Sequence, residues 1–104
     1  VITTLTRRES LVIGPDIALQ IAKEHLTTLG WPITSYVFEV KELSNVMRPP
    51  MIYGPEDANR VLTDSWLVYC YDAIPIYILK SSNLVVVSKH DGRVHYAGSA
   101  NDEG

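Results

Sequence analysis

The chain offers few side chains that could act as nucleophiles. Its single cysteine, Cys70, lies between two tyrosines in an apolar run, whereas a catalytic thiol needs a neighbouring base or a helix N-terminus that lowers its pKa. We therefore interpret Cys70 as a buried structural residue. A single cysteine also excludes an intrachain disulfide, so we do not expect a disulfide-stapled secreted scaffold.

The histidines and carboxylates do not form a metal-binding or acid–base pattern. His25 lies near the end of a predicted helix, and His90 and His95 flank a predicted turn, whereas zinc generally needs three or four ligands. No pair of carboxylates is placed so that a shared environment would separate their pKa values. A phosphate-binding loop and a nucleophile elbow are also missing. We predict no catalytic residue, no metal site and no cofactor.

The composition predicts one small globular domain spanning residues 1–104. With 46% hydrophobic and 20% charged residues, the chain is too apolar for disorder. Its formal net charge of -3 argues against a general nucleic-acid binder, which would carry a basic face. No run of about 18 apolar residues suggests a membrane span, and the first residues do not resemble a signal peptide. We expect a cytoplasmic protein without nucleic-acid or membrane partners.

An amphipathic helix is predicted at about residues 15–29. Gly14 suits the N-cap, Pro15 the first helical position and Gly30 the left-handed conformation that ends helices. At helical periodicity the apolar residues fall on one broad arc, which consists of Ile17, Ala18, Leu19, Ile21, Ala22, Leu26 and Leu29. This face should pack on a sheet.

Two strands are predicted at residues 33–43 and 64–71, with a short helix at about 56–62 between them. The second strand is apolar on both faces, so it should lie centrally. In the first strand, one face carries Tyr36, Phe38 and Val40. Residues 73–80 are ambiguous between an edge strand and a connection, because Pro75 cannot donate to a ladder.

A β-hairpin is predicted to turn at Asp91-Gly92, residue types that tolerate positive φ. A two-residue loop would place Val87 opposite Tyr96, on a core face with Val85 and Val94. The other face would be half-solvated; it carries Leu84, Val86, Ser88, His90, Arg93, His95 and Ala97. The tail from about residue 98 should fray. We thus predict an α+β fold, with the helix on one face of a three-to-five-strand antiparallel sheet that ends in a hairpin.

Two segments carry more apolar residues than this fold requires. The loop at 46–53 combines residue types that are enriched in protein interfaces, namely Met47, Arg48, Met51, Ile52 and Tyr53. An equally good interpretation folds this loop back onto the sheet. Residues 74–79, which include Ile76 and Tyr77, form an apolar stretch at a predicted edge. Such an edge needs a cover, either the N-terminal segment, a second copy or a partner.

The order of helix, tryptophan strand and hairpin is similar to that of a known family. Residues 18–26 (ALQIAKEHL), 64–69 (DSWLVY) and 84–100 (LVVVSKHDGRVHYAGSA) resemble the YrhB-like immunity proteins of bacterial toxin systems. The match covers the helix and the hairpin well and the middle of the chain poorly. The Pro49-Pro50 loop and residues 74–79 have no counterpart in the family pattern.

The resemblance implies a bacterial, non-enzymatic immunity protein that binds and neutralises a cognate toxin. Trp66, Gly92 and Gly98 would then define the fold, while the variable segments would contact the toxin. One alternative is another small protein-binding or self-associating module, such as a cystatin-like domain, and a homodimer would fit it. A third, less favoured class is an enzyme that uses Cys70 or a histidine.

Overall fold

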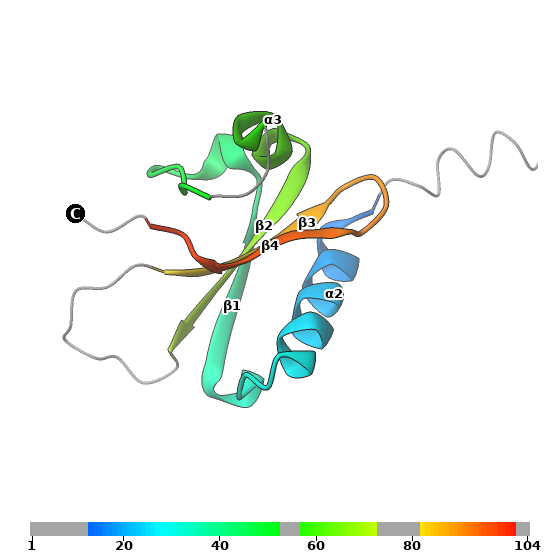
Figure 1. Ribbon diagram of the computed structural model, residues 1–104, viewed down its shortest axis with the longest axis vertical. Coiled ribbons are helices and arrows are strands. Elements are labelled where there is room, and N and C mark those ends of the chain that lie inside the picture. Colours follow the sequence, from blue (N-terminus) through cyan, green and yellow to red (C-terminus); the bar gives the residue numbers. More distant parts are fainter. Residues whose placement is uncertain (1–12, 53–56, 73–81, 102–104) are drawn as a thin grey trace, which may run out of the picture.

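The computed structural model describes residues 13–52, 57–72 and 82–101. Within these ranges, helix α2 (Pro15–Thr28) packs on one face of a four-stranded antiparallel sheet, and the short helix α3 (Ala58–Thr63) lies on the other side (Figure 1). The chain is an α+β protein whose sheet ends in a hairpin, as the sequence predicted.

Helix α2 begins at Pro15 and ends one residue before the predicted position. After its last turn Gly30 takes a φ of +86°, and its N–H donates to the carbonyl of Thr27. The buried stripe is narrower than the predicted arc and consists of Ala18, Ala22 and Leu26. Ile17 and Leu29 are 49% and 53% exposed. The small alanines let the helix approach the sheet along a stripe of four-residue spacing, with Leu19 and Ile21 partly buried beside it.

The sheet follows chain order, β1 (Tyr36–Lys41), β2 (Ser65–Asp72), β3 (Asn83–Ser88) and β4 (Val94–Ser99), with every neighbouring pair antiparallel. It is strongly twisted, so that β1 and β4 cross in Figure 1. β1 is shorter than predicted, because 3-10 turns occupy both of its flanks. β2 lies centrally and is apolar on both faces, as expected.

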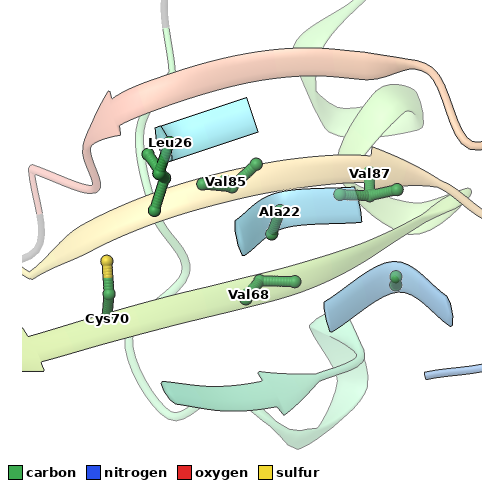
Figure 2. Packing of buried hydrophobic residues seen from close by; sticks show 7 residues of the cluster. Ala22, Leu26, Val68, Cys70, Val85 and Val87 are labelled. Atoms are coloured by element: carbon green, nitrogen blue, oxygen red, sulfur yellow. The ribbon is translucent and has the colours of Figure 1, made fainter. Parts of the chain in front are cut away.

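Each face of the sheet carries its own core. The helix-side core, part of which is shown in Figure 2, consists of Ala18, Ala22, Leu26, Val68, Cys70, Val85 and Val87. The opposite core is covered by α3, by the inner end of the loop that contains Ile52, and by the residue that follows β4. Its buried residues are Ile52, Leu62, Leu67, Tyr69, Leu84, Val86 and Ala100. β2 and β3 are therefore buried on both faces over most of their length.

The hairpin loop is wider than predicted. Ser88 pairs with Arg93, since the Ser88 N–H donates to the Arg93 carbonyl at 2.8 Å, which leaves four residues in the loop. The Ser88 hydroxyl accepts a hydrogen bond from the N–H of His90. The Asp91 carboxylate accepts another from the N–H of Arg93, and this bond lowers the pKa of Asp91. These side-chain bonds favour the wider loop over the two-residue turn.

The predicted hairpin register is therefore wrong. Val86 rather than Val87 lies opposite Tyr96, and a bulge follows before Val87 pairs with Val94. The predicted half-solvated face is also wrong, since Leu84 and Val86 are 1% and 0% exposed. A one-residue shift of register changes which side chains share a face, so Tyr96 packs on the opposite core and not on the helix-side core.

The predicted fraying from residue 98 does not occur through Asn101. Gly98 and Ser99 belong to β4, and Ala100 is completely buried. The Ala100 N–H donates to Ser82, and its carbonyl accepts a hydrogen bond from the N–H of Met51. The tail is ordered to this point because it completes the opposite core.

Gly92 provides a test of how the hairpin docks on α2. Its φ is +76°, and an added Cβ would lie 2.9 Å from the terminal methyls of both Ile13 and Ile21. Gly30, with a φ of +86°, has open space around it and is a matched control. We expect Gly30→Ala to cost about 1 kcal/mol for the backbone conformation alone. Gly92→Ala should cost about 0.5–1.5 kcal/mol more, because the flexible ends of both isoleucine side chains must leave their present rotamers. Urea unfolding measures both, and equal losses would show that the hairpin does not press on α2.

Candidate partner-binding site

The loop after the second 3-10 turn divides into an outer and an inner part. Met47 is 98% exposed and Met51 55%, and Arg48 is also exposed. Ile52, by contrast, is 6% exposed and belongs to the opposite core. Ile52 covers the apolar face of β2 and β3, which fits the alternative interpretation in which this part of the loop folds back onto the sheet. Tyr53, Ile76 and Tyr77 lie outside the described residues.

The outer part of the loop borders an open hollow of about 330 Å³. The hollow lies on the sheet face opposite α2, and its lining consists of Lys41, Val46, Met47, Arg48, Tyr69 and Tyr71. The structure thus brings two of the predicted partner-binding residues, Met47 and Arg48, together with side chains of β1 and β2. The hollow combines an apolar wall, two aromatic rings and two cationic side chains.

Interactions along the strands hold the tyrosines of the hollow in place. The rings of Tyr69 and Tyr71 stack with centroids 6.2 Å apart and planes 6° from parallel. The Tyr71 hydroxyl donates to the Glu39 carboxylate at 3.2 Å, and the ammonium of Lys41 lies 3.7 Å from the same carboxylate. The aromatic wall is therefore preorganised, which reduces the entropy that binding would otherwise cost.

Sequence reasoning missed the strand residues of this surface. Val37 is 55% exposed and lies opposite Tyr71 in the β1–β2 ladder, and Tyr71 is itself 38% exposed. Both side chains point away from α2, on the sheet face formed by β1 and the adjoining part of β2. Alternation within each strand indicated the two faces, but only the pairing register places Val37 beside Tyr71.

The residues predicted to define the fold make structural contacts. The Trp66 indole N–H donates to the carbonyl of Ile13 at 2.7 Å, which ties the start of α2 to β2. The ammonium of Lys89 lies 4.8 Å from the centre of the Trp66 ring and 2.6 Å from the Glu42 carboxylate. Gly98 has a different environment, in which an added Cβ would lie 3.3 Å from the Tyr96 hydroxyl.

Neither a metal site nor a reactive thiol occurs in the described ranges. In residues 13–52, 57–72 and 82–101, no group of three or more His, Cys, Asp or Glu could hold a metal ion. Cys70 lies in the helix-side core (Figure 2), and burial, together with the nearby charge of Asp72, raises its pKa to about 11. Over the same ranges, no helix has both the length and the apolar character needed to cross a membrane.

Comparison of the chain with protein-family models, with curated proteins and with solved structures found no significant match. The resemblance to the immunity proteins accordingly rests on the sequence pattern of helix, Trp66 strand and hairpin.

The buried state of Cys70 predicts a thiol that labels slowly. A rise in pKa from 9.0 to about 11 lowers the thiolate fraction at pH 8 roughly a hundredfold, and burial slows access further. We expect iodoacetamide to label the native protein at least about a hundredfold more slowly than the urea-unfolded chain, and the rate to rise as the pH approaches 11. Labelling at the same rate in both states would contradict the packing of β2 against α2.

Proposed function

We propose that this protein is a non-enzymatic immunity protein that binds and neutralises a cognate bacterial toxin. The family resemblance supports the proposal, and one structural observation carries the choice of surface. Met47 projects almost fully into solvent beside a preorganised aromatic hollow. An immunity protein of this kind would act in the cytoplasm of the cell that it protects.

The surface has the composition of an interface rather than of an ordinary loop. Methionine, tyrosine and arginine are enriched where proteins bind each other, and all three surround the hollow. An exposed methionine gains about 1.5–3 kcal/mol when a partner buries it. Its unbranched side chain also adapts to the shape of the partner. Met47 would be the central anchor of the contact.

The charges around the hollow indicate what it accepts. Lys41 and Arg48 line it, although the chain as a whole carries a formal charge of -3. A toxin side chain with an apolar body and an acidic end would find complementary groups here. Neutralisation then requires only that the bound protein covers the active site or the substrate entry of the toxin and dissociates slowly. It needs no chemical step on the immunity protein.

The test is a binding measurement with the product of the adjacent gene. We expect Met47→Ala to weaken the complex about 10- to 100-fold, as truncation of a central anchor does, and to reduce protection when the toxin is co-expressed. Leu29→Ala is the matched control, because Leu29 is an exposed apolar residue at the end of α2, outside the hollow.

The outcomes distinguish an error in the proposed function from an error in the proposed contact surface. If the adjacent gene product is neither bound nor neutralised by the unaltered protein, the proposed function is wrong. If it is bound, but Met47→Ala and Leu29→Ala behave alike, the function stands and the contact lies elsewhere.

A further inference from the structure

Strand β1 forms an edge of the sheet. Among the described residues it pairs only with β2, which leaves the backbone groups on its other side without a strand partner. Its sequence, YVFEVK, contains neither proline nor glycine, and its ladder with β2 has no register shift. Edge strands that stay single usually carry a proline, a bulge, an inward-pointing charge or charged side chains, above all lysine. β1 has neither a proline nor a bulge, but it carries Glu39 and Lys41, so these two charges decide which neighbouring strand it could accept.

We propose that this neighbour is the β1 strand of a second copy of this chain. The two strands would pair antiparallel about a twofold axis at Val40 and join the two sheets into one. The proposal does not depend on toxin binding. It rests on the charge pattern of β1, which is complementary to itself in this register.

The register follows from strand geometry. In an antiparallel pair each residue lies directly opposite one residue of the other strand, in hydrogen-bonded and non-hydrogen-bonded pairs that alternate along the ladder. A twofold axis therefore passes through a residue pair. An axis at Glu39 would place two carboxylates opposite each other, and an axis at Phe38 would place Glu39 opposite Val37. An axis at Val40 places Glu39 of each copy opposite Lys41 of the other, so that both charges are paired.

The side chains of β1 are accessible for this contact. Glu39 and Lys41 lie on the face away from α2, with side chains 50% and 34% exposed, and within one chain they are only loosely paired at 3.7 Å. Val37 on the same face is 55% exposed. A second strand would give each charge a directly opposed partner and would cover part of the apolar surface.

Aromatic side chains line the same edge on the helix side. Trp31 and Tyr36 have ring centroids 6.0 Å apart, and Tyr36 and Phe38 follow at 6.5 Å. All three are only partly buried. A second copy paired about Val40 would cover the Phe38 end of this row and not Tyr36, because residues 43–45 form a 3-10 turn and do not continue the opposing strand that far.

Charge reversal tests the register directly. We expect the unaltered protein to be a dimer in light scattering or sedimentation at micromolar concentrations. Glu39→Lys would place lysines opposite each other, and Lys41→Glu would place carboxylates opposite each other. Each variant alone should dissociate, with a dissociation constant raised at least about tenfold. An equimolar mixture of the two should form a heterodimer, because every opposed pair then has opposite signs.

A matched control is Glu24→Lys, which makes the same charge change on an exposed position of α2 and should leave the dimer intact. Circular dichroism would check that all variants remain folded. A monomeric unaltered protein would overturn the proposal, and so would single variants that stay dimeric or a mixture that does not form the heterodimer. None of these measurements involves a toxin, so failure here leaves the proposed function untouched.

Discussion

The two middle strands, β2 and β3, carry apolar side chains on both faces, and the described parts of the chain are arranged to cover them. Helix α2 covers one face through Ala18, Ala22 and Leu26. On the other face the described residues include no long helix, and shorter pieces cover it: α3, the inner end of the loop at Ile52, and Ala100 after β4. Because burial of apolar surface is the main favourable term in folding, these segments are held in place although their local sequences have little regular pattern.

This composite cover ends before the outer strand. Above β1 and the adjoining half of β2, the face opposite α2 carries Val37, Tyr71 and the hollow beside Met47, all accessible to solvent. The same loop therefore serves two purposes, with its inner end in the core and its outer end beside an open surface. A segment anchored by core contacts can present exposed side chains in a fixed position, which is favourable for binding.

Both proposals concern the part of the sheet around β1, but apart from Lys41 they use different groups. Toxin binding is assigned to the face of β1 and β2 and to the adjoining loop, whereas pairing with a second copy uses the backbone edge of β1. Lys41 takes part in both, since it lines the hollow and lies opposite Glu39 in the proposed pairing. An edge strand can offer its face and its edge to two different partners at once.

The sequence by itself determined the element types, because they depend on local periodicity and on residues with restricted backbone angles. Gly14, Pro15 and Gly30 located α2, and apolar residues at successive positions of β2 indicated a central strand. The immunity-protein resemblance, also a property of the sequence, stays a prediction.

Tertiary structure decided the rest. The hairpin register depended on side-chain bonds of Ser88 and Asp91 that widen the loop. The position of the tail through Asn101, the exposure of Met47 and the burial of Ile52 depended on which apolar surface of the sheet was not covered by helix α2. Such contacts join residues far apart in the chain, and no local pattern encodes them.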